Sequence, residues 1–313
     1  MIRGGTKMRT DNNIERVMQI YQSTISSLDN VLIGQKNVKK AVAASILCDS
    51  SSKILLTGNT GTGKTTLSNY LASGFNAQRI SVTSDMIPSD VQDQLKEKKD
   101  MEFLQVDEFN RASGKVQSTF IELFAEKQIS IAGTKYNFND FYVFATQNSA
   151  DISGIFNVPQ AIYDRFDVNV YFENLTDEEK RQLFFSEFEP ATQSNITEKD
   201  LLVTKTTVDG FKTEKNDEDI MMQTFELVDS MTINGKKLFA GSNIRAHKFA
   251  LKLAKFTALS SGRDYILPAD IVDFINYLYM HRIDQNVARI GDENVCNKFY
   301  DVQNQVLSLK RKK

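Results

Sequence analysis

Apolar and polar residues alternate with two different periods along the chain. Up to about residue 175, short apolar runs of strand length alternate with stripes of helical spacing. From Thr176 onward the spacing is helical throughout. The runs that we predict to be core strands are 54–56, 79–82, 101–106, 141–145 and 168–172. This pattern predicts a three-layer α/β domain with a five-stranded parallel sheet, followed by an all-helical domain.

The changes of period divide the chain into three parts. We predict an N-terminal arm with a helical stripe at residues 1–28, the α/β core at residues 29–190 and the helical domain at residues 191–313. The core is expected to finish with a helix that begins at Thr176, because Thr176 and Glu179 have the spacing of a capping box.

The most informative stretch follows the first core strand. Three glycines within six residues precede a lysine and two threonines, and apolar residues then recur at helical spacing. A strand, a glycine-rich loop and a helix in this order indicate a P-loop, whose backbone N–H groups and helix N-terminus bind phosphate. The alternative is a glycine-rich turn without a ligand, which the flanking strand and helix disfavour. The predicted nucleotide-binding residues are Gly58, Asn59, Thr60, Gly61, Thr62, Gly63, Lys64, Thr65 and Thr66.

Four side chains could supply the chemistry of a P-loop enzyme. Lys64 is expected to contact the β- and γ-phosphates of ATP, and the Thr65 hydroxyl to hold Mg²⁺. The run 101–106 ends in Asp107 and Glu108, at the sheet edge where parallel sheets bind ligands. We predict that Asp107 also binds Mg²⁺ and that Glu108 deprotonates the attacking water.

A polar residue also closes the next core strand. The run 141–145 continues to Asn148, whose amide could position the same water; an asparagine that merely begins a loop is the alternative. Before this strand the pattern predicts a hairpin. Its strands are expected at 128–131 and 138–143, and its turn at 133–137.

Composition excludes several classes of protein. The chain has 313 residues, of which 41% are hydrophobic, and a net charge of −2, as is typical of a globular protein. This charge predicts no strong affinity for nucleic acid by bulk attraction, and we expect the basic tail 310–313 to be solvated. Cys48 and Cys296 are predicted to be reduced, buried thiols of a cytoplasmic protein. No apolar run is long enough to span a membrane.

Several short motifs follow one another in a fixed order along most of the chain. They are the P-loop and the segments 33–35, 83–90, 106–112, 145–148, 158–166, 244–246 and 261–263. In this order they resemble the MoxR-type AAA+ ATPases, from Val31 to about Phe274. The resemblance implies an ATP- and Mg²⁺-dependent core with a helical lid. It also implies a ring homo-oligomer, usually a hexamer, that acts on a protein substrate or with a partner bearing a von Willebrand A domain.

The resemblance also implies roles that spacing alone does not assign. Ile33, Gly34 and Gln35 fall in the segment that lines the adenine pocket of the family, and Asn148 matches its sensor 1 residue. The chain departs from the family at 91–100, where family members have a longer insertion. We therefore expect the first inserted hairpin of the family to be shortened here, and we do not assign it the contact with substrate that it makes in the family.

Three arginines match arginines of the family. Arg165 matches the arginine finger, which reaches the γ-phosphate of the neighbouring subunit, and Arg111 would face the same interface. Arg245 matches sensor 2, which touches ATP in its own subunit. Ordinary ion pairs with carboxylates such as Asp164 or Asp107 are the alternative for Arg165 and Arg111. A solvated helix N-terminus is the alternative for Arg245.

Three functions are compatible with these motifs. The first is an oligomeric Mg-ATPase that remodels a partner protein. The second is a nucleic-acid motor resembling the minichromosome-maintenance helicases, although Lys135 and Tyr136 in the hairpin offer little for tracking a phosphate backbone. The third, a small-molecule P-loop kinase, is disfavoured by the helical C-terminal domain and the acidic pair Asp107-Glu108.

Overall fold

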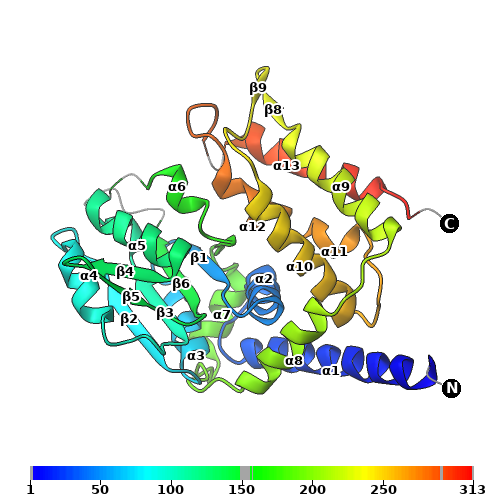
Figure 1. Cartoon of the computed structure of the whole chain (residues 1–313), viewed down its shortest axis with the longest axis horizontal. Coiled ribbons are helices and arrows are strands. Elements are labelled where there is room, and N and C mark those ends of the chain that lie inside the picture. The colour runs from blue at the N-terminus through cyan, green and yellow to red at the C-terminus, as the bar shows by residue number, and fades with distance from the viewer. Residues whose placement is uncertain (1–2, 149–155, 157, 290–291, 312–313) are drawn as a thin grey trace. The chain divides into compact units, whose positions relative to one another are not determined.

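The computed structural model describes residues 3–148, 156, 158–289 and 292–311, which Figure 1 colours along the chain. They divide into two compact units. The core unit contains Thr24–Ile46 and Ser50–Thr197, and the lid unit contains Leu47–Asp49 together with the segments before Thr24 and after Thr197. Among the described residues, no helix combines the length and the apolarity that a membrane span requires.

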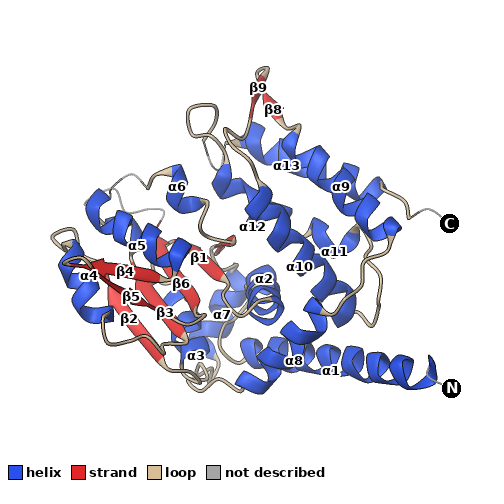
Figure 2. Ribbon diagram, viewed as in Figure 1, coloured by secondary structure: helices blue, strands red, loops and turns tan. Residues whose placement is uncertain are grey.

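The core unit is built on a five-stranded parallel sheet, which confirms the predicted fold class. The strand order is β2-β3-β6-β1-β7, and each neighbouring pair is parallel. Figure 2 colours the strands red and the helices blue. The strands are β1 (Lys53–Gly58), β2 (Ala77–Ser81), β3 (Phe103–Asp107), β6 (Tyr142–Asn148) and β7 (Val168–Tyr171).

Apart from α2 (Lys36–Cys48), which precedes β1, helices of the core unit follow the strands along the chain. Parallel strands need such crossovers, and the crossovers bury both faces of the sheet. The helices that follow strands are α3 (Lys64–Ala72), α4 (Pro88–Leu95), the short η1 (Phe109–Arg111), α5 (Gly114–Glu126), α6 (Gln160–Tyr163) and α7 (Asp177–Phe185).

Alternate residues of each strand face opposite helical layers. Leu55 and Ala145 belong to the apolar cluster that the sheet shares with α4, α5 and α6. On the opposite face, Gln105 of β3 donates hydrogen bonds to Ser68 and Asn69 of α3, at 2.9 and 3.0 Å. The core unit therefore has the three layers that the alternating pattern predicts.

The predicted hairpin is present but its second strand is displaced. β4 (Gln128–Ile131) pairs antiparallel with β5 (Thr134–Asn137), whereas we predicted the second strand at 138–143. That prediction was wrong because the turn is much shorter than expected. Ala132 and Gly133 have φ values of 47° and 83°, which is the backbone of a two-residue hairpin turn.

The lid unit is helical, as predicted, and also contains a short hairpin that the pattern does not reveal. The first helix packs within this unit, where the ring of Tyr21 meets Phe256 edge to face at 5.5 Å between centroids. The elements are α1 (Arg3–Asp29), which runs on into the core unit, α8 (Glu198–Asp209), α9 (Lys215–Asp229), β8 (Thr232–Ile233), β9 (Lys236–Lys237), α10 (Ile244–Ser260), α11 (Ala269–Val272), α12 (Ile275–Tyr279), η2 (Met280–Arg282) and α13 (Glu293–Ser308).

Buried carboxylates hold arginines inside the lid unit. Arg263 contacts Asp270 with both terminal nitrogens, at 2.8 and 2.5 Å. Arg311 contacts Asp217, and its guanidinium lies 4.7 Å from the ring centre of Tyr265. The prediction of a solvated tail was therefore wrong for Arg311. Asp217 is fully buried, and a buried carboxylate is stable only with a counter-charge.

The two cysteines have different surroundings. Cys48 is buried, as predicted, whereas Cys296 is exposed. The prediction was wrong for Cys296 because it follows Val295 on an amphipathic helix. Val295 and Phe299 carry the buried stripe of α13, and Cys296 lies off that stripe.

Candidate functional site

The register of the sheet brings predicted site residues to one edge. Gly58 at the end of β1 is paired with Asn148 at the end of β6, and Ser81 with Asp107 at the end of β3. Glu108 follows Asp107 directly. Because the carboxyl ends of parallel strands meet at the same edge, residues far apart in the sequence become neighbours there.

The loop between β1 and α3 has a backbone that requires glycine. Gly61 and Gly63 have φ values of 81° and 96°, in the left-handed region that residues with a Cβ rarely adopt. A Cβ at Gly63 would also lie 2.5 Å from Cδ2 of Leu32. The loop leads straight into α3, so the unpaired N–H groups of its first turn face the same space.

Lys64 is the first residue of α3 and is buried against the loop. Its Nζ donates hydrogen bonds to the carbonyl oxygens of Gly58 and Asn59, at 2.7 and 2.6 Å. Burial lowers the pKa of the Lys64 ammonium, because desolvation disfavours its charged form. An anion bound by the loop would therefore meet a cation that the loop itself holds in place.

A cavity of about 250 Å³ lies between this loop and the ends of β3 and β6. Its lining combines a cation, several hydroxyls, one carboxylate and two amides. Such a set of groups suits a phosphorylated ligand. The lining residues are Thr60, Gly61, Gly63, Lys64, Thr65, Thr66, Glu108, Thr146, Gln147 and Asn148.

The two predicted acids have different environments. The side chain of Asp107 is 10% exposed and that of Glu108 is 49% exposed. Glu108 has a φ of 56°, and its N–H donates a hydrogen bond to Oγ1 of Thr146 at 3.1 Å. The same hydroxyl donates to Oδ1 of Asp107 at 3.4 Å. Thr146, which the sequence analysis did not single out, therefore connects both acids.

Each acid also contacts an arginine. Nε of Arg111 lies 3.0 Å from Oε2 of Glu108, so Arg111 has the ion pair that we considered as an alternative, with a different carboxylate. Nε and Nη2 of Arg79 both lie 2.6 Å from Oδ2 of Asp107. Sequence reasoning missed Arg79. The available signal was a charged residue inside a short core strand.

Asn148 contacts the glycine-rich loop. Its Nδ2 donates a hydrogen bond to Oγ1 of Thr60 at 2.9 Å, and its own carbonyl oxygen accepts one from Asn110 at 3.1 Å. The neighbouring Gln147 donates to Oγ1 of Thr57, at 2.9 Å. The amide of Asn148 is therefore held at the cavity, against the glycine-rich loop.

None of the three predicted arginines lines this cavity, although Arg111 contacts Glu108 at its edge. Arg165 follows α6, and its Nη1 donates a hydrogen bond to the carbonyl oxygen of Ala161 at 2.9 Å. Arg245 is exposed in the first turn of α10, in the lid unit. Their expected roles, in a neighbouring subunit and in the lid, stay predictions.

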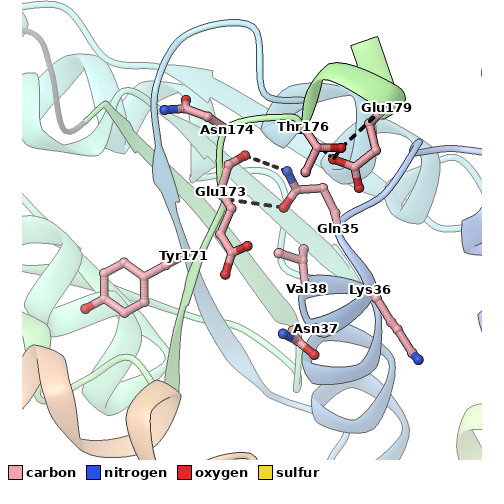
Figure 3. A pocket seen from close by; sticks show the side chains of 9 residues that line it. All are labelled: Gln35, Lys36, Asn37, Val38, Tyr171, Glu173, Asn174, Thr176 and Glu179. Atoms are coloured by element: carbon pink, nitrogen blue, oxygen red, sulfur yellow. Dashed lines mark hydrogen bonds between the residues drawn. The ribbon is translucent and has the colours of Figure 1, made fainter. Parts of the chain in front are cut away.

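A second cavity, of about 180 Å³, lies beside the predicted adenine segment (Figure 3). Gln35 forms two hydrogen bonds with the backbone of Glu173, donating to its carbonyl oxygen at 2.6 Å and accepting from its N–H at 3.3 Å. Gly34 has a φ of 64°, and a Cβ there would overlap Oε1 of Glu179. Ile33 is buried. The lining residues are Gln35, Lys36, Asn37, Val38, Tyr171, Glu173, Asn174, Thr176 and Glu179.

Two contacts join the adenine segment and its neighbourhood to the P-loop. Leu32, just before that segment, packs against Gly63. Nδ2 of Asn59 donates a hydrogen bond to Oδ1 of Asn174 at 3.2 Å. The P-loop, the segment 32–35 and the loop after β7 therefore converge within the core unit. This arrangement places a phosphate-binding loop next to a pocket of polar groups.

Comparison with known protein families agrees with this geometry. Residues 53–168 match the ATPase family associated with various cellular activities (AAA), and residues 231–295 match the AAA lid domain. The fold and the site thus define an AAA ATPase, a class in which a P-loop core is followed by a helical lid. Relatives narrow the assignment further, and the chain belongs to the MoxR family of AAA ATPases.

Individual relatives match half of the chain or more. The chain is 27% identical to the chaperone MoxR1 of Mycobacterium tuberculosis, and the match covers 87% of this chain and 78% of the relative. It is 29% identical to the protein MoxR of Paracoccus denitrificans, over 50% of this chain and 51% of the relative. A crystal structure of a predicted ATPase from Cytophaga hutchinsonii has the same fold, with a TM-score of 0.77 at 24% identity. The match covers 98% of this chain and 99% of that one.

Proposed function

We propose that this protein is a Mg²⁺-dependent ATPase that works as a ring homo-oligomer and remodels a partner protein. One observation carries the proposal: Lys64, Thr65, Glu108 and Asn148 line a single cavity at the carboxyl edge of the sheet. Family membership implies ATP hydrolysis, and this cavity supplies groups suited to binding phosphate, to holding a metal ion and to activating a water molecule.

The donor set of the cavity fits Mg²⁺, which prefers a few hard oxygen ligands. Thr65 presents a hydroxyl in the cavity lining, and the carboxylate of Asp107 is connected to the lining through Thr146. These two side chains would hold the ion. When bound, the ion would neutralise part of the negative charge that develops on the phosphates during transfer.

The remaining groups would position and activate the attacking water. Lys64 would bind the β- and γ-phosphate oxygens, and the N–H groups of the loop would bind the phosphates between them. Glu108, whose carboxylate is half exposed at the cavity, would accept the proton of the water. Asn148 would orient that water with its amide. Ile33, Gly34 and Gln35 would position the adenine base beside the second cavity.

A ring assembly would complete the site from outside the chain. The γ-phosphate that leaves carries spread negative charge, and Lys64 and Mg²⁺ cover only one side of it. Arg165 does not line the cavity of its own chain, which supports a role at the cavity of a neighbour. Arg245 would contact ATP from the lid of the same subunit.

Partner remodelling is supported by the relatives. The relative from Mycobacterium tuberculosis is named a chaperone, and a protein substrate or a von Willebrand A domain partner is the matching proposal for this chain. The nucleic-acid motor has less support, since Lys135 is the one cation of the hairpin residues 128–137.

Glu108→Gln tests this function. The amide keeps the size of the side chain and removes the base, so ATP hydrolysis should fall by roughly 10²- to 10⁴-fold while ATP still binds. Phosphate release and equilibrium binding of a fluorescent ATP analogue would be measured on the same preparation. Light scattering with ATP should then show a stable oligomer trapped by the variant.

A matched control is Glu178→Gln on α7, an exposed carboxylate outside both cavities, which should hydrolyse ATP at the parent rate. If Glu108→Gln also hydrolyses at the parent rate, Glu108 is not the base. If the parent protein binds no ATP at all, the proposed function is wrong as a whole.

A further inference from the structure

We propose that Arg79 is a positioning residue that fixes the carboxylate of Asp107 for the Mg²⁺ bound with ATP. The inference rests on the proposed function and extends it to β2, a strand that carries none of the predicted site residues. Arg79 touches neither phosphate nor metal in this proposal, and it acts through Asp107.

The sheet register places the two side chains on the same face. Arg79 lies opposite Gln105, and Asp107 lies two residues beyond Gln105 on β3. Residues two apart on a strand face the same side of the sheet. Gln105 faces α3, because it donates hydrogen bonds to Ser68 of that helix. Arg79 and Asp107 therefore meet on the side of the sheet that carries the P-loop helix.

Arg79 uses two nitrogens to hold one oxygen. Its Nε and Nη2 both lie 2.6 Å from Oδ2 of Asp107. Such charge-assisted contacts are short and strong, and two of them fix a direction as well as a distance. The other oxygen, Oδ1, accepts the hydrogen bond of Thr146 at 3.4 Å, and Thr146 lines the cavity. The carboxylate of Asp107 is thus oriented by Arg79 through Oδ2, and its other oxygen, Oδ1, lies on the side of the cavity.

This orientation matters because Mg²⁺ demands nearly ideal octahedral geometry and takes few protein ligands. Hydrogen-bonding partners of a ligating side chain typically change metal affinity by about 10- to 100-fold. Asp107 is 10% exposed and Arg79 is 48% exposed, so the arginine brings its charge to a carboxylate that water barely reaches. Without Arg79, Asp107 would rotate or repack, and it would present its oxygens to the ion less well.

An ordinary ion pair that only fastens β2 to β3 is the competing explanation. It would stabilise the fold equally with and without metal. Positioning, in contrast, changes only the part of nucleotide binding that depends on Mg²⁺. The ratio of nucleotide affinities with Mg²⁺ and with EDTA separates the two explanations, and it does not require ATP turnover.

The experiment measures equilibrium binding of a fluorescent ATP analogue to the full chain in Mg²⁺ and in EDTA. Arg79→Met keeps the apolar stem and removes the guanidinium. It should reduce the enhancement of affinity by Mg²⁺ ~10-fold and leave the affinity in EDTA unchanged. Arg79→Lys, which offers one nitrogen, should reduce the enhancement of affinity by Mg²⁺ about threefold. The exposed Arg181 on α7 supplies the control for lost charge, and Arg181→Met should change neither affinity.

A double-mutant cycle shows whether Arg79 acts through Asp107. Asp107→Asn should remove most of the Mg²⁺ enhancement, and adding Arg79→Met to it should change the ratio by less than about twofold, as expected for two residues that act as a unit. If Arg79→Met does not fold, Arg79→Lys and the same cycle with Lys decide the question.

Two outcomes would overturn the proposal. An unchanged Mg²⁺ enhancement in Arg79→Met and Arg79→Lys would leave Arg79 without a role at the metal; if the affinities in Mg²⁺ and in EDTA also fall equally, with a lower melting temperature, the ion pair is purely structural. A larger enhancement would mean that the arginine competes with Mg²⁺ for Asp107. The proposed function would instead be refuted if Mg²⁺ left the ATP affinity of the parent protein unchanged and the Lys64→Ala variant bound ATP as tightly as the parent does.

Discussion

Arginines of the core unit and of the lid unit contact carboxylates in different surroundings. In the lid, Arg263 and Arg311 contact carboxylates that are almost fully buried, and the contacts tie segments of that unit together. In the core, Arg79 and Arg111 are themselves partly exposed and contact the acidic pair at the edge of the cavity.

The difference shows that residue type does not separate structure from function. A guanidinium paired with a buried carboxylate inside the lid removes an unfavourable charge from the interior. In our proposal, a guanidinium beside Asp107 or Glu108 orients a carboxylate at the edge of the cavity. Position relative to the cavity would then decide which of the two roles an arginine has. Variants of single arginines and lysines can therefore test the contrast.

The largest effect is expected from Arg165→Ala. A finger from the neighbouring subunit contacts only the transition state, so the variant should bind ATP normally and hydrolyse it ~10³-fold more slowly or worse. Phosphate release and ATP affinity would be measured on the same preparation. A change of less than tenfold in hydrolysis would place Arg165 with the structural arginines.

Mixing variants tests whether that contribution crosses subunits. The Arg165→Ala subunit keeps an intact P-loop, and the Lys64→Ala subunit keeps an intact Arg165. Mixed oligomers should regain part of the activity that each variant lacks alone. If assembly of mixed oligomers is verified and nothing is regained, Arg165 acts within its own chain or not at all.

A smaller effect is expected from Lys64→Ala alone on nucleotide affinity. The variant removes the cation that the loop holds next to the phosphates, and a hydrogen bond to a charged group contributes about 1.5 to 3 kcal/mol. ATP affinity should therefore fall by roughly 10- to 150-fold by fluorescence titration. Lys115→Ala, an exposed lysine on α5, is the control and should bind as the parent does. Equal affinities of both variants would contradict the assignment of the P-loop.

Arg245→Ala probes a lid arginine that differs from Arg263 and Arg311. Arg245 is exposed in the first turn of α10, so its loss should leave the melting temperature unchanged. ATP affinity should fall ~10-fold if the lid brings this charge to the phosphates. Lys248→Ala, which is exposed on the same helix, is the matched control. A lower melting temperature with unchanged affinity would assign Arg245 to the architecture of the lid.

The smallest effect on ATP binding is expected from Arg311→Met, which should act on stability alone. It leaves Asp217 buried without this partner, and the free energy of unfolding of the lid unit should fall by about 2 to 4 kcal/mol. Denaturant unfolding measures this, with Lys310→Met as a control one residue away. ATP affinity of the folded variant should match the parent. If the variant were as stable as the parent but bound ATP more weakly, Arg311 would not be a structural arginine, and the difference between the two units would not hold.

The sequence predicted the architecture of the core and its central motifs. Short apolar runs alternating with helical stripes predicted the parallel sheet, and the structure confirms it. These features follow from local rules, since burial on both faces requires apolar strands and a left-handed φ at Gly61 and Gly63 requires glycine. The same reasoning predicted Lys64, Glu108 and Asn148 at one edge of the sheet, and in the structure all three line one cavity.

Only the tertiary structure decided which side chains meet across the sheet and within the lid. No spacing rule pairs Arg79 with Asp107, Gln35 with the backbone of Glu173, or Arg311 with Asp217, because 28, 138 and 94 positions separate the partners. We predicted the hairpin turn at the wrong residues because alanine rarely adopts a positive φ, so the residue type of Ala132 gives no sign of the turn. Strand register and helix packing fix these contacts, and both arise from the summed burial of the whole chain rather than from any local pattern.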